Sequence, residues 1–212
     1  MWNDFIDLKQ ELTRIFTYYC EGGRPDHYEE YGHYNWYWKS KKLELGHISV
    51  VDKRESHGIW MMHVNAYSNC TYPMPIYGFD VVCAKKKVTG CFHDLSPVGY
   101  NDMKMIRKEV KRERELPDWA KEIFSGGMLA AGNITERDQC LEYATQGMDN
   151  LEAWFLQLET IQMMPPSVKF MNARTKYCHN QLQNPHSFNV MKSLGFDEEY
   201  LKEFKTTKQF PF

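Results

Sequence analysis

The strongest candidates for proton transfer in this sequence are a histidine and an aspartate with sixteen residues between them. His63 lies in the run GIWMMHVNAY and Asp80 in the run PIYGFDVVCA. A carboxylate among such neighbours is expected to be buried, and a buried charge is costly unless it is paired or changes its protonation state. A coupled imidazole and carboxyl can hold and release a proton near neutral pH, which suits a general acid. The alternative is that Asp80 only satisfies hydrogen bonds of the fold.

Short apolar or alternating runs between about residues 34 and 94 are expected to position this pair. Their length and their β-branched and aromatic content predict strands joined in sequential hairpins, hence a mostly antiparallel sheet. The runs are HYNWYW, LELGHISVV, GIWMMHVNAY, PIYGFDVVCA and VTGCFHDL, with DKRESHG and AKKK as two of the turns. His63 and Asp80 then lie on adjacent strands of one hairpin. His47, on the strand before, would lie behind or beside His63, although a lone strand histidine is more often a core residue.

Helices are expected at both ends of the chain. Apolar residues at three- and four-residue steps predict a first helix that ends before Gly22; they are Phe5, Leu8, Leu12, Ile15 and Phe16. From Asn101 onward helices dominate, beginning with a charged surface helix over NDMKMIRKEVKRERE. The segment IFSGGMLAAG is expected to add an edge strand.

Three further helices follow in the prediction. Thr135 caps a long helix that runs through Met163 or Met164, where Pro165-Pro166 stops it. Another helix covers residues 167–182, and a third follows Asn184-Pro185, an N-cap with the favoured first-turn proline. The expected architecture is α/β, a three-layer α/β/α sandwich with a central mostly antiparallel sheet, in a single domain over residues 1–212.

Composition narrows the classes of function. The 26 basic residues are balanced by 28 acidic ones, which argues against a nucleic-acid binder. The 15% aromatic content and the 12 methionines suit a flat ligand, or simply an aromatic core. The six cysteines show no C-x-x-C spacing, so we expect reduced thiols and no zinc, iron–sulfur or other metal site.

The location expected from the sequence is the cytoplasm. Acidic residues interrupt the apolar stretches of the amphipathic N-terminal segment, which is unlike a signal peptide. No run approaches the roughly 18 apolar residues of a membrane span. We therefore expect a soluble protein without membrane contact, and a monomer, since no long apolar edge or heptad stands out.

Taken together, the motifs resemble the ferredoxin-dependent bilin reductases, with the phycocyanobilin:ferredoxin oxidoreductases as the most similar branch. The resemblance rests on three features: a histidine and an aspartate with sixteen residues between them (His63 and Asp80), the motif P-I-Y-G-F-D that ends at Asp80, and the later motif D-L-S-P. It covers roughly residues 30–212. It implies that His63 and Asp80 flank the bilin, that His47 matches an upstream family histidine, and that Thr89 contacts a propionate.

The motif Y-C-x-x-Q-x-x-N resembles a family helix that lines the pocket. It implies substrate contacts from Tyr177, Gln181 and Asn184, and we add His186 to this group. Three departures from the family pattern bear on the product. Ser49 stands where the phycocyanobilin branch carries a vinyl-directed glutamate, Gly132 near where a propionate-binding arginine is expected, and Pro185-His186 where many relatives have Asp-Lys. With these acids absent, Asp80 would have to act alone as the central proton donor.

The resemblance implies biliverdin IXα as substrate and reduced ferredoxin as an external one-electron donor, with bilin radicals as intermediates and no bound cofactor. The absence of a Gly-rich dinucleotide motif agrees with this expectation. Asp80 would protonate the bilin, His63 would share that proton, and His47 would orient His63 from behind. The expected product of the four-electron reduction is phycoerythrobilin. The alternatives are phycocyanobilin, if Glu44, Glu55 or a water replaces the missing acid, and a non-catalytic bilin carrier.

Lysines in the predicted turns are candidates for docking ferredoxin. Ferredoxin is acidic, so its docking face should be basic. The lysines available are Lys39, Lys41, Lys42, Lys85, Lys86 and Lys87. They are equally well explained as solubilising residues.

Overall fold

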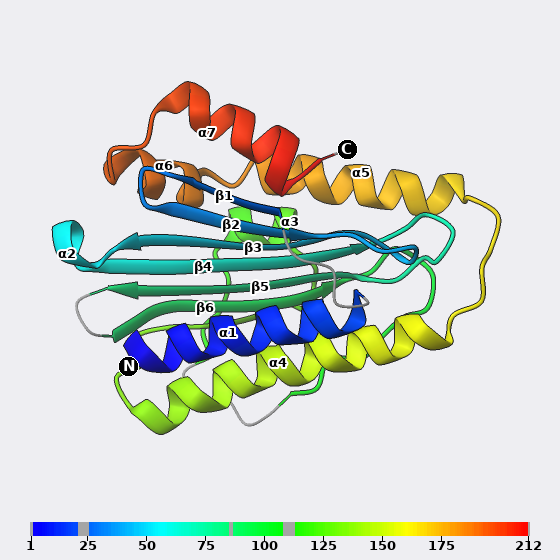
Figure 1. Ribbon diagram of the computed structural model, residues 1–212, viewed down its shortest axis with the longest axis horizontal. Helices are drawn as coiled ribbons and strands as arrows, with labels where there is room; N and C mark the ends of the chain where they lie inside the picture. The colour runs from blue at the N-terminus through cyan, green and yellow to red at the C-terminus, as the bar shows by residue number, and fades with distance from the viewer. Residues whose placement is uncertain (1, 21–25, 85–86, 108–112, 212) are drawn as a thin grey trace.

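The computed structural model describes residues 2–20, 26–84, 87–107 and 113–211, and it contains one seven-stranded antiparallel sheet (Figure 1). The strands follow one another across the sheet in chain order; they are β1 (Asp26–Glu30), β2 (His33–Trp38), β3 (Leu43–Lys53), β4 (Ile59–Ser68), β5 (Ile76–Ala84), β6 (Lys87–Ser96) and β7 (Leu129–Ala131). The expected hairpins and the expected edge strand are confirmed. Strand β1 was not expected.

Two long helices cover one face of the sheet. Figure 1 shows α1 (Trp2–Tyr19) and α4 (Arg137–Thr160) side by side against it. Alternate strand residues such as Ile48, Val64 and Phe79 pack here, and they are almost fully buried. This face forms the main hydrophobic core, and burial of such side chains contributes the dominant favourable free energy of folding.

The opposite face lies beneath the C-terminal helices. They are α5 (Val168–Leu182), α6 (Pro185–Ser193), α7 (Glu198–Phe204) and a π-helical turn over Lys205–Gln209. The strand residues that point this way form two smaller apolar clusters with these helices, one around Tyr67 and Phe170, the other around Val51 and Leu201. The three-layer α/β/α arrangement is therefore confirmed, and the site residues lie on this second face.

The prediction of a charged helix from Asn101 is wrong over the described part of this segment. Residues 101–107 and 113–117 form no helix, and 108–112 lie outside the described residues. Long-range hydrogen bonds hold this segment extended. The Asn150 amide oxygen accepts from the Ile106 N–H at 2.8 Å, and its amide nitrogen donates to the Ile106 carbonyl at 3.0 Å. The Arg114 N–H donates to the Ala130 carbonyl. Such pairing overrides the local helix propensity.

Two other boundaries differ from the prediction. Helix α4 begins after Glu136 rather than Thr135, because Ile134 is held in an antiparallel bridge with Val88 of β6. It ends at Thr160, before the prolines. Three short helices were not expected: α2 (Arg54–His57) in the turn DKRESHG, α3 (Asp118–Ile123), and α7 with the π-helical turn that follows it. Helix α5 begins as predicted, with the Ser167 hydroxyl accepting from the Phe170 N–H.

Candidate functional site

His63 and Asp80 are cross-strand neighbours in the hairpin of β4 and β5. Their side chains point to the face beneath the C-terminal helices, and His63 Nδ1 lies 2.5 Å from Asp80 Oδ1. The histidine side chain is 15% exposed, whereas the aspartate side chain is 39% exposed. His63 is therefore largely buried, whereas Asp80 is accessible to a ligand. Asp80 is less buried than its apolar neighbours in the sequence suggest.

Asn65 fixes the tautomer of His63. Its amide nitrogen donates to the backbone carbonyl of Gln209 at 3.0 Å, which sets the amide orientation, and it lies 3.2 Å from His63 Nε2. His63 Nε2 is then the acceptor, so Nδ1 carries the proton and donates to Asp80. Sequence reasoning missed Asn65. Its position two residues after His63 on one strand places both on the same face, and this spacing was the available signal.

His47 lies near His63 without a hydrogen bond between them. The two ring centroids are 6.4 Å apart, and His47 Nε2 donates instead to Asn35 Oδ1 at 2.9 Å. On its other side the ring of Tyr37 stacks at 4.6 Å. Burial first, and the neighbouring histidines second, hold the pKa of His47 well below its usual value. His47 is therefore a neutral ring that packs beside the pair.

Ser49 has a structural partner in this arrangement. It is the cross-strand neighbour of both Asn35 and His63, and its hydroxyl lies 2.6 Å from Nε2 of His33. Nδ1 of His33 lies 2.8 Å from the Tyr200 hydroxyl of α7. The serine thus helps to tie the sheet to α7, at a position directly beside the proton-handling pair.

His33 makes folding stability depend on pH. Burial lowers the pKa of His33 to about 4, whereas the pKa of an unfolded histidine is about 6.5. Between those values the unfolded chain binds more protons, so the free energy of unfolding should fall as the pH falls from 6.5 to 4, by up to about 3 kcal/mol. Chemical denaturation at several pH values measures this. His33→Gln should flatten the dependence, and the exposed His57→Gln should not; equal slopes for both variants would contradict the role of His33.

The substrate contacts implied by the resemblance lie at different distances from the pair. Tyr177 of α5 comes close to it: its hydroxyl would lie 3.6 Å from a Cβ built on Gly78, the residue two before Asp80. Burial, followed by the negative charges of Asp94 and Asp80, raises the pKa of Tyr177 well above 10. The phenol therefore stays protonated and can donate a hydrogen bond near Asp80.

The other substrate contacts implied by the resemblance lie on or just after α5, on β6 and on α6. Gln181 is buried one turn after Tyr177, and Asn184 follows at the end of α5. The hydroxyl of Thr89 donates to the Val82 carbonyl of β5 at 3.1 Å, so it is already engaged. His186 falls on α6, but its side chain lies outside the described residues.

Asp94 is a second carboxylate on the same face that sequence reasoning did not single out. It is the cross-strand neighbour of Gly78 on β6 and is 7% exposed. The hydroxyls of Ser96 and Ser125 donate to its two oxygens. Burial outweighs these bonds and raises its pKa. Because both oxygens already accept hydrogen bonds, Asp94 is less available to a ligand than Asp80.

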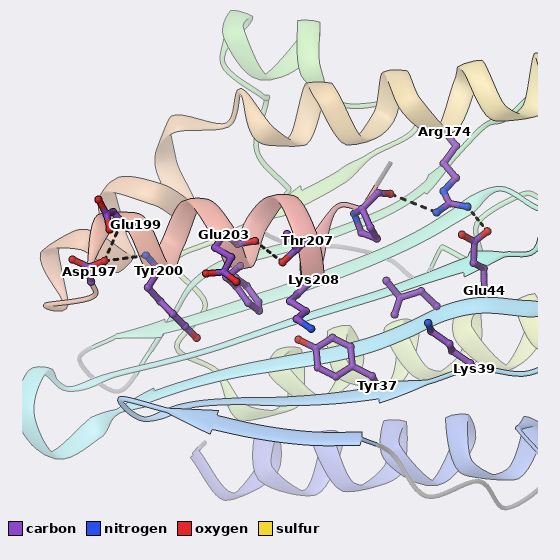
Figure 2. Close-up of a pocket in the computed structure, with 13 residues that line it drawn as sticks. Tyr37, Lys39, Glu44, Arg174, Asp197, Glu199, Tyr200, Glu203, Thr207 and Lys208 are labelled. Carbon is purple, nitrogen blue, oxygen red and sulfur yellow. Dashed lines mark hydrogen bonds and ion pairs between the residues drawn. The ribbon is translucent and has the colours of Figure 1, made fainter.

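A cavity of about 790 Å³ opens between α7 and the strands β2 and β3 (Figure 2). Its wall includes Tyr37 of β2, Lys39 just after β2, and Arg174 of α5, which pairs with Glu44. Neither His63 nor Asp80 lines it. Tyr37 links the two places, because its ring stacks on His47, which in turn lies beside His63.

The ring of Phe210 closes over His63 from the C-terminal segment, with 5.7 Å between the ring centroids. The preceding residue, Gln209, accepts hydrogen bonds from Asn65 and from the Tyr67 hydroxyl through its carbonyl. Gln209 and Phe210 are thus part of the site. Within the described ranges, no three His, Cys, Asp or Glu side chains gather as metal ligands would. In the same ranges, no helix combines the length and the apolar character needed to cross a membrane.

Several known proteins share the sequence pattern and the fold. The family model described as ferredoxin-dependent bilin reductase matches residues 19–211. The phycocyanobilin:ferredoxin oxidoreductase of Trichodesmium erythraeum (strain IMS101) is 26% identical over 187 residues, which are 80% of this chain and 71% of the relative. The enzyme of the same name from Prochlorococcus marinus (strain MIT 9515) is 24% identical over 190 residues, 84% of this chain and 76% of the relative.

Two solved structures show the same fold. The structure of PcyX has a TM-score of 0.69 and 24% identity, with 98% of each chain covered. Tomato phytochromobilin synthase, solved in complex with biliverdin, has a TM-score of 0.71 and 13% identity, with 97% of this chain and 82% of that chain covered. The family model spans nearly the whole sequence, and the sheet carries the histidine–aspartate pair on its helix-covered second face. This chain therefore belongs to the ferredoxin-dependent bilin reductase family and is an oxidoreductase that acts with ferredoxin.

Proposed function

We propose that this enzyme reduces biliverdin IXα to phycoerythrobilin, with four electrons delivered singly by reduced ferredoxin and four protons taken up by the bilin. The observation that carries the proposal is the His63–Asp80 pair, in which a partly exposed carboxylate is held by a sheltered imidazole. Electrons come from outside the chain in such a reaction, so the protein's part is to bind, to orient and to supply protons.

Asp80 is the proton donor in this proposal. Its exposed carboxyl can meet the bilin, while its other contact is the Nδ1–H of His63. After Asp80 gives up its proton, the resulting carboxylate is stabilised by that hydrogen bond. His63 cannot turn away easily, because Asn65 holds the opposite ring nitrogen. The pair can therefore be reloaded from solvent and used again in each protonation.

The absence of an acid at position 49 supports phycoerythrobilin as the product. Ser49 is directly beside His63 in the sheet and is engaged by His33. The proposed replacements, Glu44 and Glu55, are not its cross-strand neighbours: Glu44 pairs with Arg174 at the cavity, and Glu55 is exposed on α2. One proton-donating carboxyl then serves the reduction, which favours the methine bridge and the A-ring diene over the D-ring vinyl group.

Anaerobic turnover of biliverdin with a ferredoxin-reducing system tests the proposal. Product absorption spectra and chromatography against authentic bilins should identify phycoerythrobilin. Phycocyanobilin as the product would contradict the assignment of specificity to Ser49. Biliverdin that binds stoichiometrically and is released unchanged would instead identify a carrier and would refute the reductase function.

Docking of ferredoxin through lysines is a further part of the proposal. Lys39 and Lys41 are exposed in the turn between β2 and β3. Lys42 is engaged, because its ammonium donates to the carbonyls of Leu158 and Glu159 at the end of α4, and Lys87 donates to Asn133. Lys85 and Lys86 lie outside the described residues. Among those of these lysines that the structure describes, Lys39 and Lys41 are therefore the most accessible.

Turnover should fall as ionic strength rises. Electrostatic steering of an acidic protein weakens when salt screens the charges, so kcat/KM for ferredoxin should drop about fivefold between low and physiological salt. Lys41→Ala should lower kcat/KM at low salt only, whereas Lys192→Ala on α6 should not change it. Turnover that is insensitive to salt, with unchanged biliverdin affinity, would refute the docking role.

A further inference from the structure

Asn65 of β4 lies between the segment after α7 and the proton-handling pair, and it is fully buried. Both hydrogens of its amide nitrogen are used: one is donated to the Gln209 carbonyl at 3.0 Å, and the other faces His63 Nε2 at 3.2 Å. A reversed amide would set its oxygen against the Gln209 carbonyl oxygen, two acceptors with no hydrogen between them. The donor side of Asn65 is therefore held toward His63.

This orientation restricts where the pair can keep an extra proton. A charged imidazolium carries an N–H on both ring nitrogens. Nδ1–H of His63 already donates to Asp80, so a second N–H at Nε2 would face the N–H of Asn65, donor against donor. Asp80 meets no such conflict, because a proton on its Oδ2 leaves the bond between Oδ1 and Nδ1–H in place. The extra proton is therefore favoured on the carboxyl group, which is 39% exposed.

The fold by itself has little need of an amide at position 65. Asn65 Oδ1 finds no hydrogen-bond donor among the residues that the structure describes. The Gln209 carbonyl has a second donor in the Tyr67 hydroxyl at 3.3 Å. A buried amide whose polar atoms are only partly paired is a weak stabiliser, and an apolar side chain of similar volume suits such a place as well. The contact that requires an amide is therefore the one with His63.

We infer that Asn65 is a positioning residue that keeps His63 neutral and so leaves the transferable proton on Asp80. This inference rests on the proposed function, because it concerns the proton that Asp80 gives to the bilin. Asp80 passes this proton to a bilin that has taken up an electron from ferredoxin, becomes a carboxylate and regains a proton from solvent. His63 stays neutral throughout. The Gln209 carbonyl, which prevents the amide from turning, makes this arrangement depend on how the segment after α7 packs on the sheet.

Other titratable groups face the pair from three neighbouring elements. They are His47 from β3, Tyr177 from α5 and Asp94 from β6. Burial keeps His47 neutral and the Tyr177 phenol protonated, and both oxygens of Asp94 accept hydrogen bonds from serines. None of the three contacts the Asn65 amide in a printed hydrogen bond of the pair's network, so a substitution at position 65 acts first on His63.

Nitrogen-15 NMR of the ligand-free protein, labelled in its histidine rings, tests the protonation of His63 without turnover. The His63 signals are identified by their loss in His63→Gln. In the wild type near neutral pH they should show a neutral ring with the proton on Nδ1. Asn65→Asp places an acceptor beside Nε2 and should convert the ring to imidazolium. A wild-type ring that is charged or carries its proton on Nε2, or identical His63 signals in Asn65→Asp and the wild type, would overturn the inference.

Turnover of biliverdin with reduced ferredoxin tests the consequence for catalysis. Asn65→Asp should lower kcat about tenfold or more and change biliverdin affinity less than about threefold. The limb on which kcat falls with rising pH should move to lower pH, because Asp80 must then take up its proton beside a charged imidazolium. Asn65→Leu should keep its Tm within about 4 °C of the wild type. A large loss of Tm in Asn65→Leu with an unchanged His63 tautomer would show a structural role and overturn the inference.

Asn133→Asp is the matched control, since it adds the same charge at an exposed residue whose side-chain oxygen accepts from Lys87 before and after the change. Its His63 signals and its kcat should equal those of the wild type. Unchanged His63 signals in Asn65→Asp would overturn the inference while wild-type turnover leaves the proposed function intact. A wild type that binds biliverdin without reducing it would refute the reductase function, and the NMR comparison would still decide whether Asn65 keeps His63 neutral.

Discussion

Asp80→Asn should bind biliverdin with nearly wild-type affinity and reduce it about a thousandfold more slowly, the range expected when a general acid is lost. The amide oxygen of asparagine can still accept the hydrogen bond from His63 Nδ1, so the histidine should keep its place. The amide has no proton to transfer near neutral pH, so the bilin should stall after an electron arrives. Single-turnover spectroscopy under anaerobic conditions measures both the rate and any accumulated one-electron intermediate.

The matched control for this result is Asp118→Asn on α3, whose side chain is fully exposed. It should turn over biliverdin at the wild-type rate. Normal turnover by Asp80→Asn would show that another group donates the proton, and Asp94, with its raised pKa, would be the next acid to test on this face. Loss of biliverdin binding in Asp80→Asn would instead show that the carboxylate holds the ligand.

Trp154→Ala should lower the free energy of unfolding by about 4 kcal/mol, which corresponds to a fall in Tm of roughly 10 °C for a chain of this size. Trp154 is completely buried on α4, and its indole N–H donates to the Pro75 carbonyl at 2.7 Å. Pro75 immediately precedes β5, the strand that carries Asp80. The substitution leaves a cavity and also an unsatisfied carbonyl, so the loss combines packing and hydrogen bonding.

Two other tryptophan variants separate these contributions. Trp154→Phe keeps most of the volume and loses the N–H donor, so it should cost about 1–3 kcal/mol. Trp119→Ala, at a side chain that is 41% exposed, should change stability by less than about 0.5 kcal/mol. Thermal and chemical denaturation measure all three. A loss in Trp154→Ala no larger than that in Trp119→Ala would mean that α4 does not fix the start of β5.

The sequence by itself determined the strands and the pair of residues that they bring together. Alternation of apolar and polar residues specifies which side chains share a face, and short turns make consecutive strands neighbours, so the pairing of His63 with Asp80 follows from local pattern. The first helix, the helix capped by Ser167 and the edge strand near Ala131 were predictable for the same reason. These features depend on residues close together in the chain.

Only the tertiary structure decided the surroundings of that pair. The bond from Asn65 to Gln209 joins residues 144 positions apart, and it is this bond that fixes the tautomer of His63. The charged segment that contains Arg114 has the composition of a surface helix, yet hydrogen bonds to Asn150 and Ala130 hold its described parts extended. Long-range bonds of this kind leave no period or spacing in the sequence. The proton-handling pair was therefore predictable from the sequence, whereas the residues that orient it became visible only in the fold.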